Sequence, residues 1–157
     1  MTNQTDKRRM HVLVTGGGAF GSYVARDLVD KGHEVTLLDE DSSVIAELKE
    51  RLPNVRLVCG DACEPRILEE AGILRADVVV AATSDDEDNL VIALLSHKEF
   101  DVSRVVARVN DPRNGWLFTD WWGVDHALSA PDAFVPMVEE FVASAPQHPA
   151  EAPPETR

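Results

Sequence analysis

A glycine-rich turn between a short apolar strand and an amphipathic helix constrains this chain more than any other feature. Residues 11–15, His-Val-Leu-Val-Thr, have the length and character of a buried strand, and residues 16–21, Gly-Gly-Gly-Ala-Phe-Gly, follow the pattern G-x-G-x-x-G. Apolar residues then recur at helical spacing over 20–29, until Lys-Gly at 31–32 ends the helix. In such a unit the first glycine turns sharply, the second lets the backbone approach a diphosphate, and the third lets helix and strand pack closely. The pattern predicts a dinucleotide-binding turn, and a turn without a ligand is the alternative.

Strand and helix patterns alternate along the rest of the chain. We expect further strands at 34–38, 55–59, 77–82, 104–109 and 125–128, separated by helices that begin near residues 42, 65, 84 and 112, with a last helix over 131–143. Alternation of this kind requires right-handed crossovers. The predicted fold class is therefore α/β, a Rossmann-like doubly wound parallel sheet of six strands in the order 3-2-1-4-5-6, formed by a single domain over 11–143. We expect residues 1–10 to be a flexible N-terminal arm and residues 144–157 to be a disordered proline-rich tail.

Composition limits the partners of this domain. With 157 residues, of which 44% are hydrophobic, the chain can bury one core but has no room for a second domain that carries a substrate. Its 28 acids and 15 bases give a net charge of -13, which argues against binding to nucleic acid. No signal peptide pattern is visible, and the longest apolar run, 90–95, is far shorter than a membrane span of about 20 residues. We therefore expect a cytoplasmic protein without direct membrane insertion.

Ligands of this fold bind beyond the carboxyl ends of the strands, so acids that follow strands are candidate site residues. Asp39 follows the second strand, where its carboxylate can accept hydrogen bonds from both ribose hydroxyls of an adenosine. Glu40 and Asp41 beside it add negative charge that would repel a 2′-phosphate, which disfavours NADP. Asp61 follows the third strand, and there it either accepts from the exocyclic amine of adenine, beside Ala62, or is an ordinary turn residue.

Polar residues at the fourth and fifth strands complete the predicted site. Thr83 and Ser84 can donate to phosphate or ribose, although Ser84, three residues before Glu87, also fits a helix cap. Arg108 lies among valines in the fifth strand, so its charge requires either a bound phosphate or a neighbouring carboxylate. The two cysteines, Cys59 and Cys63, are expected to fill core or loop positions, and no metal site is predicted.

The C-terminal third of the predicted domain contains two aromatic features. We expect one short helix over 112–122, with Trp121 and Trp122 packed within it rather than on a ligand. The last helix, 131–143, places Phe134, Val135, Val138, Phe141 and Val142 at helical spacing. Because a short sixth strand offers this helix little surface, we expect part of its apolar stripe to face a partner; packing on its own sheet is the alternative.

Five segments together resemble the TrkA N-terminal family, also known as the RCK or KTN domain, of potassium transport regulators. They are residues 16–21, Asp39, 60–73, 77–90 and 107–112. The resemblance implies a nucleotide-sensing regulatory domain that binds NAD or NADH, with ADP or ATP possible, and that has no catalytic activity. It also implies a membrane-embedded potassium transporter or channel subunit as partner, and a homo-oligomer, a dimer or larger ring, formed through the C-terminal helix. The residues that it assigns to the ligand, with Gly21 added from the glycine pattern, are Gly16, Gly18, Ala19, Phe20, Gly21, Asp39, Asp61, Ala62, Thr83, Ser84 and Arg108.

This chain departs from the family in two places. Ala19 stands where members that prefer ATP have an arginine, which favours NAD(H) or a diphosphate nucleotide. A proline-rich tail stands where longer members have a C-terminal lobe, so no second effector site is expected. The alternative function is an NAD-dependent oxidoreductase or epimerase-like enzyme, but the Tyr-x-x-x-Lys pair of short-chain dehydrogenases is missing, since Tyr23 is followed by Asp27.

Overall fold

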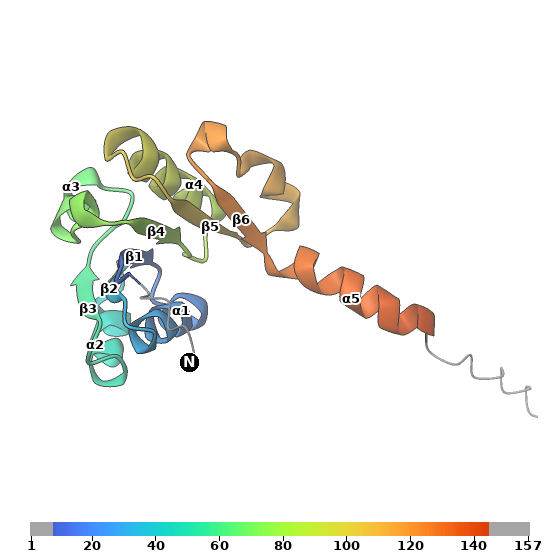
Figure 1. The fold of residues 1–157 in the computed structure, drawn as a ribbon, viewed down its shortest axis with the longest axis horizontal. Helices are drawn as coiled ribbons and strands as arrows, with labels where there is room; N and C mark the ends of the chain where they lie inside the picture. The colour runs from blue at the N-terminus through green and yellow to red at the C-terminus, as the bar shows by residue number, and fades with distance from the viewer. Residues whose placement is uncertain (1–7, 145–157) are drawn as a thin grey trace, which may run out of the picture.

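Six parallel strands form one sheet in the order β3-β2-β1-β4-β5-β6 (Figure 1). The computed structural model describes residues 8–144, so the predicted arm and tail lie, apart from 8–10 and 144, outside the described residues. The strands are β1 (His11–Thr15), β2 (Glu34–Asp39), β3 (Arg56–Cys59), β4 (Val78–Ala81), β5 (Val105–Val109) and β6 (His126–Ser129). The predicted fold class and strand order are confirmed.

Helices cover both faces of the sheet. The helices are α1 (Ala19–Asp30), α2 (Ser42–Arg51), α3 (Pro65–Glu70), α4 (Asp86–Leu94) and α5 (Ala130–Ser144), and a π-helical turn, Leu95–Glu99, continues α4. Figure 1 shows α1 and α2 on one side of the sheet and α3 and α4 on the other. Short 3₁₀ helices occupy Ile73–Arg75, Pro112–Leu117 and Asp120–Trp122.

Alternating side chains of each strand build two separate cores, which is why the strands read as continuous apolar runs. Val12 and Val14 of β1 belong to the core beneath α1 and α2, whereas Leu13 between them belongs to the core beneath α3 and α4. The same alternation places Leu37 and Leu38 of β2 in different cores, each fully buried. The candidate site residues come directly after the strands, at the edge of the sheet where the carboxyl ends of the parallel strands lie.

The predicted aromatic helix over 112–122 is wrong in detail. The backbone forms two short 3₁₀ helices, because Phe118 turns out of helical conformation at φ -81° and ψ 76° and is buried. Trp122 packs against the core beneath α4, but Trp121 is 82% exposed, so the predicted packing of Trp121 is also wrong. Neither tryptophan reaches the candidate site.

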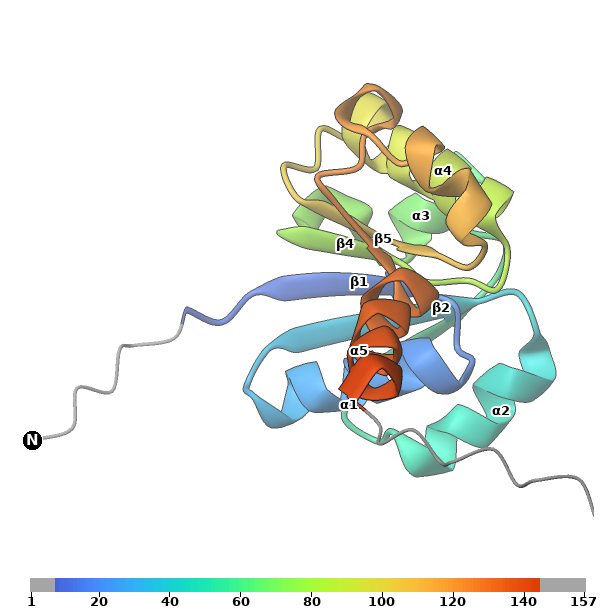
Figure 2. The same ribbon diagram turned by 90° about the vertical axis from the view of Figure 1, so that its right-hand side faces the viewer.

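The last helix, α5, leaves the domain instead of covering it. It continues from β6 and extends away from the sheet in Figure 1, and Figure 2 shows it nearly end-on, directed toward the viewer; none of its residues is buried. Phe134, Phe141 and Val142 are 62%, 73% and 70% exposed. The alternative that this helix packs on its own sheet is therefore wrong. Within residues 8–144, no helix has the length and apolar character needed to cross a membrane.

Candidate functional site

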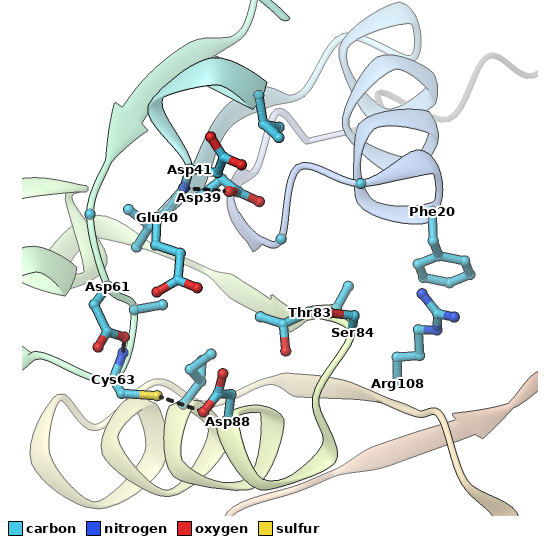
Figure 3. A pocket seen from close by; sticks show the side chains of 18 of the residues that line it. Phe20, Asp39, Glu40, Asp41, Asp61, Cys63, Thr83, Ser84, Asp88 and Arg108 are labelled. Carbon is cyan, nitrogen blue, oxygen red and sulfur yellow. Dashed lines mark hydrogen bonds between the residues drawn. The ribbon is translucent and has the colours of Figure 1, made fainter. Parts of the chain in front are cut away.

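A cavity of about 530 Å³ opens beyond the carboxyl ends of β1 to β5 (Figure 3). The structure brings all the predicted site residues except Gly21 to its wall. Those residues are Gly16, Gly18, Ala19, Phe20, Asp39, Asp61, Ala62, Thr83, Ser84 and Arg108. Strands that lie far apart in the sequence therefore deliver their following residues to one place, as the parallel topology requires.

The three glycines of the pattern have different neighbours. At Gly16, φ is +94° and a Cβ atom would lie 2.6 Å from the carbonyl oxygen of Ala82, so only glycine fits this turn. Gly21 packs beneath the turn and does not line the cavity. A Cβ atom there would lie 1.9 Å from the carbonyl oxygen of Gly16, so this close packing requires glycine. At Gly18 no atom lies within 4 Å of the Cβ position, so the backbone here is open to the cavity.

Backbone N–H groups hold the Asp39 carboxylate at the end of β2. One oxygen accepts from Gly17 N at 2.5 Å and the other from Asp41 N at 2.8 Å. Each carboxylate oxygen keeps a further lone pair for a ligand. Asp41 caps α2, and hydrogen bonds from the side chain and backbone of Ser43 hold the pKa of Asp41 below its ordinary value. Asp41 is therefore ionised near neutral pH.

Arg108 stands on another wall of the cavity, where it meets an aromatic ring instead of an acid. Its guanidinium carbon lies 5.0 Å from the centre of the Phe20 ring, the geometry of a cation–π contact (Figure 3). Among residues 8–144 it forms no salt bridge. Of the two predicted partners, a bound phosphate or a neighbouring carboxylate, the carboxylate is not found among the described residues, and the cation remains able to meet an anion in the cavity.

Thr83 and Ser84 both line the cavity but differ in their own hydrogen bonds. The Thr83 hydroxyl already lies within hydrogen-bond distance of Asn89 Oδ1, at 2.9 Å, and of the Asp85 carbonyl, at 3.0 Å. The predicted helix cap at Ser84 is wrong, since Asp85 caps α4 by accepting from Glu87 N at 2.8 Å and Asp88 N at 3.1 Å. The Ser84 hydroxyl takes no part in this cap, so it is the better placed of the two to donate to a ligand.

The wall opposite Arg108 carries Asp61, Cys63 and Asp88 (Figure 3), of which only Asp61 was predicted as a ligand-binding residue. Asp61 Oδ1 accepts from Cys63 N at 2.7 Å, and Cys63 Sγ lies 3.6 Å from Asp88 Oδ1. Burial, followed by the charges of Asp88 and Asp61, raises the pKa of Cys63 to about 12. The thiol is therefore protonated and acts as a donor. Asp88 was detectable from sequence only as a first-turn residue of a helix that begins at the carboxyl edge.

Two buried polar residues of α4, also missed, fix the backbone around the cavity. Asn89 is 0% exposed and bonds at every side-chain position. Its Oδ1 accepts from Thr83 N and Thr83 Oγ1, both at 2.9 Å, and its Nδ2 donates to the carbonyls of Thr83 and Arg108 at 3.2 and 3.0 Å. One amide thus ties the end of β4 to β5 and sets the positions of two cavity residues.

Asp86 performs the same task for the loop that follows β5. Its carboxylate accepts from Asn110 N at 2.6 Å, Asp111 N at 3.0 Å and Asn114 Nδ2 at 2.9 Å. Burial by itself raises the pKa of Asp86, but the hydrogen bonds from Asn110, Asn114 and Asp111 together hold it below the ordinary value. Asp86 is therefore ionised in the folded protein and stabilises it in that form.

We expect Asp86→Asn to lower the free energy of unfolding at pH 7 by about 2 kcal/mol or more, because the amide turns a donor toward groups that themselves donate. A depressed pKa contributes stability that is present above the unfolded value near 3.9 and is lost as the pH falls through the folded value. The difference between wild type and variant should therefore shrink below about pH 4. Urea unfolding at several pH values measures this, and a difference that is the same at pH 3 and pH 7 would contradict it.

Charge around the cavity is uneven. Its acidic residues are Asp39, Glu40, Asp41, Asp61 and Asp88, and its basic residue is Arg108, which lies over Phe20 of α1. A doubly wound sheet with an open glycine turn at its carboxyl edge and an acid after β2 defines a Rossmann-like nucleotide-binding domain. Within residues 8–144, no group of three or more His, Cys, Asp or Glu residues is arranged to hold a metal ion.

The chain belongs to the TrkA-N domain family, whose model matches residues 12–130. It is 49% identical over 138 residues to the Trk system potassium uptake protein TrkA of Mycobacterium tuberculosis, covering 85% of this chain and 60% of that protein. It is 37% identical over 120 residues to a TrkA homolog of Methanothermobacter thermautotrophicus, covering 76% of this chain and 54% of the homolog. The chain therefore spans somewhat more than half the length of these relatives.

Solved structures share the fold. The Kef C-terminal domain of Shewanella denitrificans in its AMP-bound form has a TM-score of 0.69 and 29% identity, with 85% of this chain and 80% of that chain covered. The TrkA-N domain of the Escherichia coli inner membrane protein YbaL has a TM-score of 0.74 at 18% identity, with 87% and 98% covered. The GsuK channel bound to NAD has a TM-score of 0.66 at 20% identity, with 78% and 22% covered.

Proposed function

We propose that this chain is a nucleotide-sensing regulatory domain of a potassium uptake system or channel. It acts in the cytoplasm and reaches the inner face of the membrane through a membrane-embedded transporter or channel subunit. Membership of the TrkA-N family and the names of the TrkA relatives support this role. The observation that carries the proposal is the open backbone at Gly18 within one cavity with Asp39 and Arg108.

The ligand is NAD(H) or another adenine nucleotide. Gly18, the start of α1 and Arg108 form the phosphate end of the cavity, and Asp39 accepts from the ribose hydroxyls. The volume of about 530 Å³ suits a ligand of nucleotide size. Structural neighbours carry AMP in the Kef domain and NAD or ADP in GsuK, which agrees with this class. With Ala19 in place of an arginine, ATP ranks below NAD(H) and ADP.

Binding without catalysis fits the lining of the cavity better than an oxidoreductase does. No tyrosine, histidine or lysine is among the residues that line it. Tyr23 is 72% exposed and lies outside the cavity, so the general acid of a short-chain dehydrogenase is not in place. The domain senses a nucleotide and passes that state to its partner.

Thermal-shift measurements with NAD, NADH, NADP, ATP, ADP and AMP test the proposed function. At a hundred times its dissociation constant, a bound ligand stabilises the fold by about 2.7 kcal/mol. We expect NAD to bind more tightly than NADP, because a 2′-phosphate would meet Asp39, Glu40 and Asp41. Asp39→Ala should narrow this margin by removing both a ribose acceptor and a repulsive charge.

The outcomes separate the two parts of this prediction. If none of the six nucleotides shifts the melting temperature, the proposed function fails. If NAD binds but Asp39→Ala leaves the NAD-to-NADP ratio unchanged, the carboxylate does not face the ribose. Asp30→Ala is a matched control, because it removes an acid from the exposed end of α1, away from the cavity.

Assembly of two copies through α5 completes the proposal. An apolar groove of about 350 Å³ lies over the face of β4, β5 and β6 that α1 only partly covers, and Val80, Val106 and Leu128 line it. It is the surface that α5 would cover if the helix folded back. The groove is also lined by basic residues, His33, Arg104 and Arg108, and α5 carries Asp132, Glu139 and Glu140 beside its apolar stripe. Shape and charge both suit the α5 helix of a second copy.

A further inference from the structure

Strands β4 and β5 separate just before they reach the cavity. Their ladder of paired residues ends with Ala81 and Ala107. On its other side, β5 stays paired with β6 as far as Val109 and Ser129. The stretch of β5 that carries Arg108 therefore pairs with β6 and, within residues 8–144, with no strand on the side of β4.

The side-chain amide of Asn89 fills the place where β4 and β5 separate. Its Oδ1 accepts from Thr83 N at 2.9 Å, and its Nδ2 donates to the Arg108 carbonyl at 3.0 Å. A peptide group of a strand likewise presents one acceptor and one donor to its neighbours. Because Asn89 is 0% exposed, water does not compete for these bonds. The amide thus continues the connection between β4 and β5 beyond the last strand pair.

The place of the Arg108 cation in the cavity depends on its backbone. The guanidinium carbon lies 5.0 Å from the centre of the Phe20 ring, and among the described residues no carboxylate holds it. A cation–π contact holds the cation over the ring but, unlike a bidentate ion pair, does not fix its orientation. The backbone therefore determines where the side chain starts, and Asn89 holds that backbone on the side of β4.

We infer that Asn89 is a positioning residue for the phosphates of the bound nucleotide. It does not line the cavity, and it acts by holding the backbone of Arg108, whose cation meets the phosphates. This inference rests on the proposed function, from which it takes the phosphate end of the cavity. Misplacement of a binding group by about 1 Å is enough to lose most of a directional contact. Loss of the amide should therefore weaken ligands that carry phosphates and spare a nucleoside.

A double-mutant cycle with ADP tests the inference. ADP is titrated by calorimetry onto the wild-type chain, Asn89→Ala, Arg108→Gln and the double variant. We expect each single change to weaken ADP binding about tenfold or more. The double variant should bind ADP no more weakly than Arg108→Gln does, because without the cation the amide has nothing left to position. Adenosine, which has no phosphate, should bind Asn89→Ala as it binds wild type.

Ser96→Ala is the matched control. Ser96 is also 0% exposed, lies in the π-helical turn that continues α4, and donates to the Ile92 carbonyl at 2.7 Å without lining the cavity. Its loss should lower the melting temperature of the free domain but leave the affinity for ADP unchanged. If the melting temperature shows that Asn89→Ala does not fold, Asn89→Ser replaces it in the cycle, since its hydroxyl keeps a polar atom at this buried position.

The wild-type chain provides a measurement that needs no variant. In nuclear magnetic resonance spectra of the chain labelled with ¹⁵N, ADP should shift the signals of the Asn89 side-chain amide. The reason is that the amide donates to the carbonyl of the residue that meets the phosphates. Adenosine should leave these signals in place.

The results distinguish this inference from the proposed function. If the wild-type chain binds neither ADP nor another nucleotide, both fail. If ADP binds but the two losses add in the double variant, or if Asn89→Ala weakens adenosine as much as ADP, the inference alone is overturned, because Asn89 would then serve only the fold. Wild-type affinity for ADP in Arg108→Gln, or Asn89 amide signals that ADP leaves unmoved, would overturn it as well.

Discussion

Gly18→Leu is expected to abolish nucleotide binding while lowering the melting temperature of the free domain only slightly. Gly18 has φ -62° and ψ -174°, an extended conformation that any residue adopts, and no atom lies within 4 Å of its Cβ position. A leucine therefore fits sterically, although Gly18 is the N-cap of α1 and leucine at this position costs about 1 kcal/mol of stability. Its side chain, however, enters the space at the start of α1 that the phosphates of a ligand would use.

The expected loss is the whole ligand-induced stabilisation, about 2.7 kcal/mol at a hundred times the wild-type dissociation constant. Thermal shift with and without NAD or ADP measures it. Gly115→Leu is the matched control, because Gly115 is also open at its Cβ position but lies outside the cavity, and this variant should bind as wild type does.

Gly21→Ala supplies the opposite control. A Cβ at Gly21 would lie 1.9 Å from the carbonyl oxygen of Gly16, so this smaller substitution should destabilise the free domain itself. The two glycines of one pattern thus separate binding from folding. Retained nucleotide binding in Gly18→Leu would show that the phosphates lie elsewhere and would remove the main support for the proposed ligand site.

Phe141→Asp is expected to convert a dimer or larger ring into a monomer. Phe141 is 73% exposed in a helix that has no buried residue, so in a single copy most of its ring faces solvent. Placed in the apolar groove of a second copy, it would be an anchor whose loss costs on the order of 2 kcal/mol or more, and a buried unpaired carboxylate adds to this cost.

Light scattering at micromolar concentration measures the change. Ala143→Asp is the control, since it introduces the same charge at an exposed position on the opposite side of α5 and should leave the oligomer intact. A variant in the groove, Val106→Asp, should give the same monomer as Phe141→Asp if the helix binds there. A wild-type chain that is monomeric across this range would reject the assembly.

If Gly18→Leu abolishes nucleotide binding and Phe141→Asp abolishes assembly, the nucleotide cavity and the apolar groove are two connected functional surfaces of the domain. Phe20 and Arg108 line the nucleotide cavity and the apolar groove alike. Their cation–π contact therefore stands between the proposed ligand and the proposed neighbour. A regulator of this type requires such a connection, because the nucleotide state has to be communicated to other subunits.

The sequence by itself determined the frame of the site. The glycine turn, the alternation of strands and helices, and Asp39 at the end of β2 follow from local backbone sterics and from hydrophobic periodicity, which act over a few residues. The parallel order then brings the residues after each strand to one edge, so most of the cavity wall was predictable. Gly21 was included among the ligand-binding residues from the same pattern, but the structure packs it against the carbonyl oxygen of Gly16, away from the cavity.

Only the tertiary structure decided how side chains from different elements meet. The buried amide of Asn89, the carboxylate of Asp86 and the pair of Cys63 with Asp88 join residues of α4 to other strands and loops, and no sequence period records such contacts. The direction in which α5 leaves the domain was also decided only by the tertiary structure. The apolar stripe of α5 was visible in the sequence. Such a stripe predicts that the helix is buried, but it does not identify the surface that buries it. The structure showed that the rest of the domain leaves the stripe of α5 exposed.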